Sequence, residues 1–191
     1  MKRLCVIILL ALCRPAFGQP DSLTVYNWDD VTTANPDTVY ALNLSRSKLT
    51  SLPERLSNFK KLVYLNAGKN KLTSLPKYLA ELMYLEELNV EKNKLVELPP
   101  EVCHLTSLRR LIVNRNDLEK LPDCIGMMKA LEHIDLYDNP IRNLPESLVF
   151  LENLSKIDFS GIQFSERFQQ GWRGKLPGVE LIFDNPCDCM E

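Results

Sequence analysis

The chain has 191 residues, of which 45% are hydrophobic and 25% are charged, a composition that is ordinary for a soluble protein. Lys and Arg number 23 and Asp and Glu number 25, so the formal net charge is −2. Because phosphate binding requires a strongly positive surface, this balance argues against nucleic acid as a partner.

The first residues predict a secretory signal peptide over 1–18. A basic start precedes an apolar run at 4–12, and residues 16–18 form an A-x-G cleavage site. The run is shorter than the ~20 apolar residues that a membrane span needs. Cleavage would leave 20 Lys and Arg against 25 Asp and Glu, a net charge of −5, because Lys2, Arg3 and Arg14 are removed. We therefore expect a secreted, periplasmic or cell-surface protein.

A lipid anchor on Cys13 is the alternative to simple cleavage, and only this alternative predicts contact with a membrane. The residue before a lipid-carrying Cys is usually Gly, Ala or Ser. Leu12 stands in that place and does not match the pattern, so a cleaved signal is favoured.

Residues 19–38 are polar and are expected to cap the repeats that follow. The segment carries Trp28, Val31 and Ala34 before Asn35 and Pro36. The residue before a proline is pushed out of helical conformations, so a helical turn over 29–34 should end before Pro36. A cap is needed because the first repeat would otherwise expose one side of its core to water.

From residue 39 to residue 164 the chain repeats one pattern at an interval of 23 residues. The copy that begins at Leu85 has its apolar residues and one Asn in this order: Leu85, Leu88, Val90, Asn93, Leu95, Leu98, Val102 and Leu105. The six copies, called repeats 1 to 6, begin at Val39, Leu62, Leu85, Leu108, Leu131 and Leu154, and the last is degenerate. Self-similarity at one fixed period indicates a repeat architecture.

The pattern L-x-x-L-x-L-x-x-N-x-L resembles that of the leucine-rich repeat family over about two thirds of the chain. Added prolines are similar to those of the LPxxL subtype of that family: Pro53, Pro76, Pro99, Pro122 and Pro145. The resemblance implies an α/β solenoid, a horseshoe arc with a parallel β-sheet on its concave face and short helical turns on its convex face.

The residues within each repeat agree with that fold. The first part of a repeat alternates between apolar and polar residues, which predicts a strand, and the second part has apolar residues three apart, which predicts a helical turn. In this family the Asn of the ninth position pairs with backbone groups of the turn. This structural column contains Asn70, Asn93, Asn116 and Asn139, with Ser47 and Ile162 in its end positions.

Residues 165–191 are expected to form a C-terminal cap. Ser165 is a suitable N-cap for a helix, and residues 179–183 alternate as an additional strand does. Phe168 and Trp172, four residues apart, would share one helix face and cover the open end of the core. Several residues are expected to end the helix: Gly171, Gly174, Pro177 and Gly178.

Four cysteines lie downstream of the predicted signal, and an even number in an exported chain permits disulfides. They are Cys103, Cys124, Cys187 and Cys189. Neighbouring repeats should lie ~4.8 Å apart, so a bridge between Cys103 and Cys124 is feasible although the two are out of register. The Cys-x-Cys tail resembles the opening of the cysteine-rich cap of extracellular leucine-rich repeat proteins. We expect disulfides or free thiols and no metal or other cofactor.

The concave face is the expected contact surface, because extended concave sheets are the usual binding surface of solenoids. The third, fifth, seventh and eighth residues of each repeat should point out of it. A mixed patch that includes Tyr and Arg, which are enriched in binding hot spots, is expected to contact a protein. Its members are Tyr64, Glu87, Arg110, Ile112, His133, Asp135, Tyr137 and Asp158.

A basic rim follows the eighth position of the first four repeats, before the sign of the charge reverses at Asp138. It consists of Arg46, Lys69, Lys92 and Arg115. A plain solvated face is the alternative for both the patch and the rim, because charged columns on repeat proteins often serve solubility.

The sequence predicts no catalysis. The nearest triad-like set, His133, Asp135 and Ser160, lies on outward strand positions, where such a trio arises by chance. The LPxxL effector ubiquitin ligases carry a large separate catalytic domain, and nothing here matches it. We expect a monomeric, non-enzymatic scaffold that recognises a protein through its concave face after export. Glycan binding through the exposed tyrosines and a purely structural assembly role are the alternatives.

Overall fold

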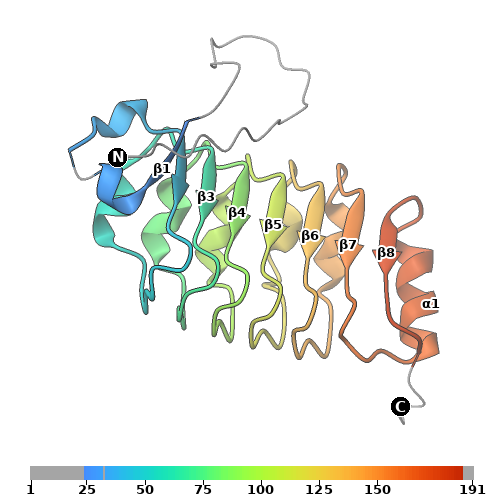
Figure 1. Cartoon of the computed structure of the whole chain (residues 1–191). Coiled ribbons are helices and arrows are strands. Elements are labelled where there is room, and N and C mark those ends of the chain that lie inside the picture. Colours follow the sequence, from blue (N-terminus) through green and yellow to red (C-terminus); the bar gives the residue numbers. More distant parts are fainter. Residues whose placement is uncertain (1–23, 32, 187–191) are drawn as a thin grey trace.

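The computed structural model describes residues 24–31 and 33–186, which form one open parallel sheet backed by short helices (Figure 1). The predicted signal peptide, Cys13 and the Cys187–Cys189 tail lie outside the described residues. Eight strands of three residues lie in the sheet in chain order. They are β1 (Val25–Asn27), β2 (Ala41–Asn43), β3 (Tyr64–Asn66), β4 (Glu87–Asn89), β5 (Arg110–Ile112), β6 (His133–Asp135), β7 (Lys156–Asp158) and β8 (Glu180–Ile182).

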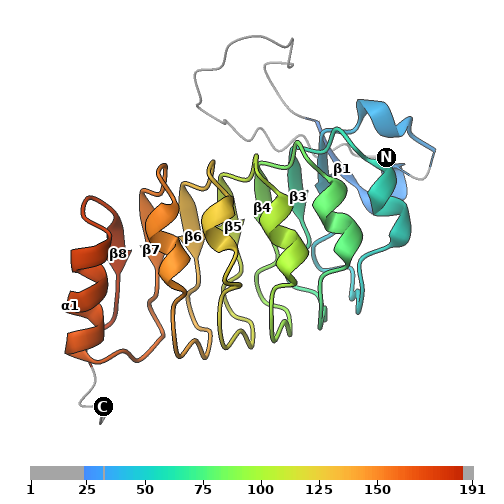
Figure 2. The same ribbon diagram turned by 180° about the vertical axis from the view of Figure 1, so that it is seen from behind.

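The other face of the sheet is covered by a row of 3-10 helices and one terminal α-helix (Figure 2). The 3-10 helices are η1 (Trp28–Val31), η2 (Pro36–Thr38), η3 (Glu54–Asn58), η4 (Lys77–Glu81), η5 (Pro100–His104), η6 (Ile125–Met127) and η7 (Glu146–Phe150), and the α-helix is α1 (Glu166–Lys175). The predicted fold class is confirmed. Among the described residues, no helix is long and apolar enough to cross a bilayer.

Neighbouring strands pair in the register of the 23-residue period, so equivalent leucines stack directly on one another. Leu42, Leu65 and Leu88 are aligned in this way and are fully buried. Each such side chain contributes roughly 1.5–3 kcal/mol on burial. No repeat can bury its own apolar face, so this stabilisation exists only in the stack.

The asparagine of the ninth position ties each repeat to the one before it. The Asn93 Nδ2 donates to the carbonyl oxygens of Val90, 2.9 Å away, and of Ala67 in the preceding repeat, 3.1 Å away. Its Oδ1 accepts from the N–H of Leu72, also in the preceding repeat, at 3.0 Å. Asn70, Asn116 and Asn139 make the same set of bonds one repeat apart.

The N-terminal segment differs from the helical turn that the sequence predicts over 29–34. The chain first adds the strand β1 to the sheet, paired with β2, and then forms the short helix η1 three residues ahead of the predicted end. Trp28 lies edge-on to the buried ring of Phe59, with centroids 6.3 Å apart. This aromatic contact stabilises the segment in a position that covers repeat 1. The strand β1 forms because the edge of β2 would otherwise present unpaired N–H and C=O groups.

The C-terminal helix α1 begins as the sequence predicts but ends later. The Ser165 hydroxyl accepts from the N–H of Phe168 and caps the helix. The helix then continues through Gly171 and Gly174, which were expected to end it. Each Gly costs only ~1 kcal/mol in a helix, and burial of Trp172 offsets that cost. The predicted strand over 179–183 appears as β8, paired with β7.

Stacked aromatic rings close the C-terminal end of the core. Phe164 stacks on Phe168 with ring centroids 4.1 Å apart, and Phe159 stacks on Phe183 at 4.9 Å. Phe159 and Phe164 meet edge to face, so the four rings form one cluster. Offset stacking and edge-to-face pairs each add ~0.5–1.5 kcal/mol beyond the area they bury.

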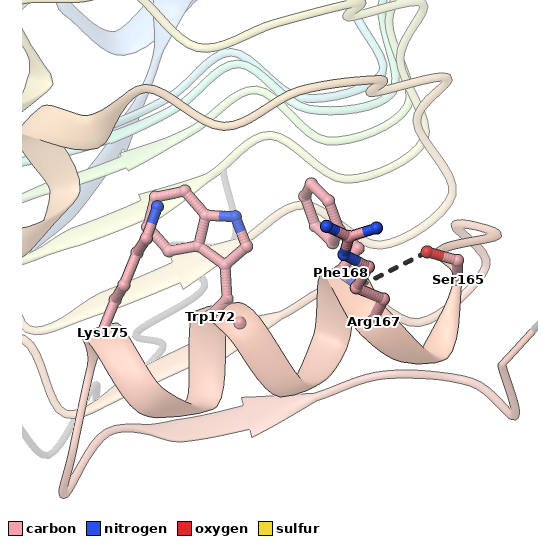
Figure 3. A pocket seen from close by; sticks show the side chains of 6 residues that line it. Ser165, Arg167, Phe168, Trp172 and Lys175 are labelled. Atoms are coloured by element: carbon pink, nitrogen blue, oxygen red, sulfur yellow. Dashed lines mark hydrogen bonds between the residues drawn. The ribbon is translucent and has the colours of Figure 1, made fainter. Parts of the chain in front are cut away.

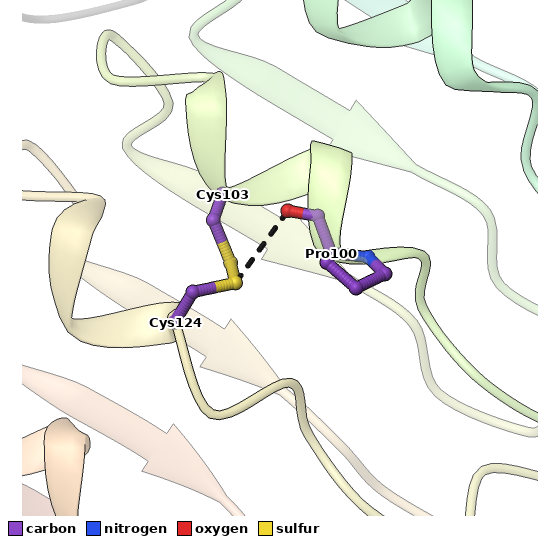
Figure 4. Close-up of a disulfide and its surroundings, with 3 residues drawn as sticks. All are labelled: Pro100, Cys103 and Cys124. Carbon is purple, nitrogen blue, oxygen red and sulfur yellow. Dashed lines mark hydrogen bonds between the residues drawn. A yellow bond between two sulfur atoms is a disulfide. The ribbon is translucent and has the colours of Figure 1, made fainter.

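A disulfide joins the convex sides of repeats 3 and 4. Cys103 in η5 is bonded to Cys124, the residue before η6, and their Cα atoms are 5.9 Å apart (Figure 4). The Cys124 Sγ also lies 3.5 Å from the carbonyl oxygen of Pro100. The offset of two positions is accommodated because η6 is shorter than its neighbours and starts later in its repeat.

Tyr78 links repeats 1 and 2, and its titration gives a test of that link. Its hydroxyl donates to the carbonyl oxygens of Pro53, at 2.8 Å, and Leu52, at 3.0 Å. Burial raises the pKa of Tyr78 to about 12, and the nearby carboxylate of Glu54 contributes in the same direction. Only the neutral phenol donates these bonds, so the protein should lose stability as pH rises from about 10, the unfolded pKa, towards 12.

We expect the free energy of unfolding to fall over that pH range by less in Tyr78→Phe than in wild type, since the variant has no phenol at this position. Urea titrations at pH 8, 10 and 11 would measure the difference between the two proteins. Parallel curves for both proteins would contradict a stabilising role for this hydroxyl.

Candidate functional site

The residues predicted to contact a partner come from the strands β3 to β7 and the turns that follow them. Strand pairing places Arg110 beside Glu87 on one side and beside His133 on the other. Ile112 is aligned with Asn89 and Asp135 in the same way. Successive residues of a strand point to opposite faces, so the third and fifth positions share the face away from the core.

The fifth position of nearly every repeat is occupied by an Asn or Asp whose side chain caps its own turn. In each case the Oδ1 accepts a hydrogen bond from the N–H two residues ahead, at 2.9 to 3.1 Å. These residues, called here the Asx ladder, are Asn43, Asn66, Asn89, Asp135 and Asp158. Asp135 and Asp158, predicted as partner contacts, therefore also hold the backbone of the sheet edge.

Ile112 interrupts the Asx ladder in repeat 4. Its side chain offers no acceptor to the N–H of Asn114, the group that the ladder would cap in this repeat. Ile112 is instead a half-buried aliphatic side chain on a face where its counterparts are polar. Repeat 4 thus lacks the side-chain cap of its turn and presents the apolar side chain of Ile112 at the centre of the sheet instead.

Charged groups surround Ile112. Arg110 Nε lies 3.6 Å from Glu87 Oε2, and the Arg110 side chain is half exposed while that of Glu87 is largely covered. Burial raises the pKa of the Glu87 carboxyl, and the positive charge of Arg110 opposes that rise. The partly buried carboxylate of Glu87 therefore holds the Arg110 guanidinium over the concave face. Less side-chain entropy is then lost when Arg110 contacts a partner.

The turns after β5 and β6 carry the rest of the patch. The Arg115 guanidinium lies over the ring of Tyr137, 5.1 Å from its centroid, and its Nε is 3.8 Å from Asp138. The Asn114 amide donates to the carboxylate of Asp135. These contacts link the turn after β5 to β6 and the turn that follows it, in the two repeats beside and including Ile112. We call Arg110, Ile112, His133 and Tyr137 the central patch.

Tyr64 differs from its prediction. It was expected to be an exposed contact residue, but only 9% of its surface is accessible. Burial raises the pKa of its hydroxyl, with a further contribution from Glu87, and the hydroxyl interacts with the side chain of Asn66. The aligned residue of the preceding strand is the small Ala41, which leaves room for the ring to settle into the sheet surface.

The triad-like set has no catalytic geometry. The Oδ1 of Asp135 accepts from the N–H of Tyr137, and the Ser160 hydroxyl donates to Asp158. Among the described residues no hydrogen bond joins His133 to either of the other two. No group of three or more His, Cys, Asp or Glu in this part of the chain is arranged to hold a metal ion.

A shallow hollow of about 410 Å³ lies along α1 (Figure 3). Phe168, Trp172 and Lys175 line it, and the Lys175 ammonium lies 4.8 Å from the centroid of the Trp172 ring. The Lys175 Nζ is also paired with Glu146 of repeat 5 at 2.5 Å. Lys175 thus holds α1 onto the stack, and the Ser165 hydroxyl caps the helix.

Comparison with known proteins extends the description of the fold. The family model described as a leucine-rich repeat region matches residues 39–176. A leucine-rich repeat protein of Leptospira interrogans, LIC12759, is similar in structure, with a TM-score of 0.63, 26% identity and 77% of this chain covered. An internalin, InlF, from Listeria monocytogenes has a TM-score of 0.64, 22% identity and 80% coverage. This chain spans 43% of the length of each of those two chains. No curated protein matches it.

Proposed function

Since this chain belongs to the leucine-rich repeat family, we propose that it is a non-enzymatic scaffold that binds another protein through the central patch of its concave face. The observation that carries the proposal is the break in the Asx ladder at Ile112. The fold alone does not favour an apolar residue there, because the same position in the other repeats holds a capping side chain.

The surroundings of Ile112 have the composition of a binding hot spot. An aliphatic anchor is bordered by Arg110 and Tyr137, and side chains of these two types are enriched in hot spots. The Arg110 and Arg115 contacts hold the border before a partner arrives. Covering Ile112 completely should contribute roughly 1–3 kcal/mol to binding, which corresponds to roughly fivefold to 150-fold in affinity.

Export before binding is supported by two features of the chain. The basic, apolar and small-residue order of residues 1–18 is that of a secretory signal. The Cys103–Cys124 bond is of the kind that persists in oxidising compartments. The partner is thus expected outside the cytoplasm or on a cell surface.

Glycan binding receives less support than protein binding. It depended on Tyr64 and Tyr137 as two exposed rings, and Tyr64 is buried. A purely structural role through an open end repeat is disfavoured as well, because aromatic clusters cover the core at both described ends.

The test is the substitution Ile112→Asn, which restores the Asx ladder. We expect the free energy of unfolding to stay unchanged or to rise by up to about 1 kcal/mol, since one capping hydrogen bond is gained. Affinity for the partner should fall by at least about fivefold. The measurements are urea denaturation and capture of proteins from the medium and envelope of producing cells.

The matched control is Asn89→Ile in the neighbouring repeat, which removes a cap and leaves Ile112 in place. It should lower the free energy of unfolding by about 1 kcal/mol without loss of capture. The double variant Arg110→Glu, Tyr137→Ala should lose capture with a normal circular dichroism spectrum. Undiminished capture by Ile112→Asn and by the double variant would place the contact elsewhere on the molecule.

A further inference from the structure

The edge of the sheet at the carboxyl ends of the strands carries a second regular surface. The predicted basic rim occupies the eighth position of repeats 1 to 4, and three lysines occupy the tenth position of repeats 1 to 3 beside it. Together they form the basic strip: Arg46, Lys48, Lys69, Lys71, Lys92, Lys94 and Arg115, all of them exposed. The ninth position, which is Ser47 in repeat 1 and an Asn in repeats 2 to 4, separates the two rows. The loops that follow the strands form the lower edge of the molecule in Figure 1.

The local charge of this edge opposes that of the whole chain. Segments 44–53, 67–76 and 90–99 together hold six Lys or Arg and two acidic residues, Glu91 and Glu97, a net charge of +4. The net charge of the whole chain is −2. Within the described residues, ion pairs engage two cations of the strip: Lys69 is 2.9 Å from Glu91, and Arg115 is 3.8 Å from Asp138.

The backbone under the strip keeps the cations on a fixed lattice. The N–H of Arg46, Lys69 and Lys92 each donates to a carbonyl of the next repeat, at 2.7 to 3.1 Å. In the second row the N–H of Lys71 and Lys94 donates to the preceding repeat, at 2.8 and 2.9 Å. The spacing along each row is therefore that of the sheet, ~4.8 Å.

Local conformation does not favour basic residues here. Arg46, Lys48, Lys69, Lys92 and Arg115 have φ angles of 51° to 59°, in the left-handed region. Gly, Asn and Asp are the residues best suited to that region, and the eighth position of repeats 5 and 6 indeed holds Asp138 and Gly161. Residues that are poorly suited to the local backbone conformation indicate that the position serves another requirement, such as binding.

We propose that the basic strip binds an acidic polypeptide segment, with carboxylates presented one helical turn apart. An α-helix advances ~5.4 Å per turn, against ~4.8 Å per repeat, so over three intervals the two lattices differ by only ~2 Å. Flexible Lys side chains span that difference. An extended strand repeats its side chains on one face every ~6.7 Å, so its spacing differs from that of the strip by ~2 Å at each interval.

The chemistry of the strip favours a polypeptide over other anionic partners. No residue of segments 44–53, 67–76 and 90–99 is aromatic, so the strip offers no ring on which a sugar could stack. The same lack removes the Trp and Phe anchors by which surface-binding proteins enter a membrane interface. The strip meets the central patch at Arg115, whose guanidinium lies over Tyr137. Its other six cations lie in repeats 1 to 3, so the strip extends the contact surface beyond the central patch.

The test uses the full chain and two labelled helical peptides of identical composition, about 20 residues long. One carries its Glu residues on a single face at i, i+4, i+7 and i+11, and the other spreads them around the helix. Fluorescence anisotropy at about 50 and 200 mM NaCl measures affinity and its salt dependence. We expect the one-face peptide to bind several-fold more tightly and to weaken with salt.

The strip variant is the triple substitution Lys48→Gln, Lys71→Gln, Lys94→Gln. Each lost pair should weaken binding about twofold, so the triple variant should bind about eightfold more weakly. The control Lys60→Gln, Lys61→Gln, Lys129→Gln removes the same charge from the opposite edge and should bind as wild type does. Ile112→Asn should also keep peptide binding.

Three results would each overturn the proposal. The first is the absence of binding at the lower salt concentration, and the second is an equal loss in the strip variant and its control. The third is displacement of the peptide by a sulfated polysaccharide or by anionic vesicles at a tenth of its concentration, which would assign the strip to another class of partner.

Discussion

Replacing Cys103 and Cys124 together by Ser should lower the free energy of unfolding by about 3 kcal/mol. The two residues are 21 positions apart, so the bond closes a loop of nearly one repeat in the unfolded chain. Cross-linking a loop of this length removes conformational entropy from the unfolded state and leaves the folded repeats as they are. The bond connects η5 and η6 on the convex side, away from both proposed contact surfaces.

Urea denaturation of wild type, with and without reductant, and of the double Ser variant would measure this effect. Reduced wild type and the variant should agree within about 1 kcal/mol, because Ser and the free thiol differ little in size. Reductant should not change the variant further. A variant as stable as oxidised wild type would mean that packing between repeats 3 and 4 alone determines their stability. Binding by either surface should be unchanged in the folded variant.

The stacked core could be predicted because each inward position is occupied by an apolar residue in several successive repeats. Leu42, Leu65 and Leu88 occupy one column, and each copy supports the assignment of the others. The strand β1 had no such support. Its three residues, Val25–Asn27, belong to no repeat, and their pairing depends on the free edge of β2. A single short segment has too weak a local preference to reveal a tertiary contact.

The Asx ladder was visible in the sequence but was interpreted as surface. Asn43, Asn66 and Asn89 stand in one position of successive repeats, and such repetition is better explained by a shared backbone bond than by a partner. Tyr64 could not be placed correctly, because the period predicts the face of a residue but not how deeply its side chain settles. In this fold, a repeated residue that serves a backbone bond indicates structure. Residues that depart from the local preference, such as Ile112 and the cations of the basic strip, indicate a requirement outside the fold.

The bonds made by the ninth-position asparagine lead to the second large effect, a loss of about 3 kcal/mol in the free energy of unfolding on Asn116→Leu. Asn116 is 6% exposed, and its Nδ2 donates to the carbonyl oxygens of Val113 and Val90, at 2.8 and 3.1 Å. Its Oδ1 accepts from the N–H of Leu95 at 3.1 Å. Leucine has a similar volume but leaves the buried N–H of Leu95 without a partner, at a cost of ~1–3 kcal/mol. It also removes one of the two side-chain hydrogen bonds to each of the carbonyl oxygens of Val90 and Val113, which keep the bonds donated by Asn93 and Asn139.

The loss should be local in origin, because the groups that lose a hydrogen bond belong to repeats 3 and 4. Hydrogen exchange should therefore accelerate most at the N–H of Leu95, while the far repeats keep their protection until the stack unfolds. The control Asn58→Leu changes an exposed asparagine at the end of η3 and should alter stability by less than about 0.5 kcal/mol. If Asn116→Leu unfolds at the urea concentration of wild type, water must replace the lost amide between the two repeats, and the asparagine column would not be what ties them together.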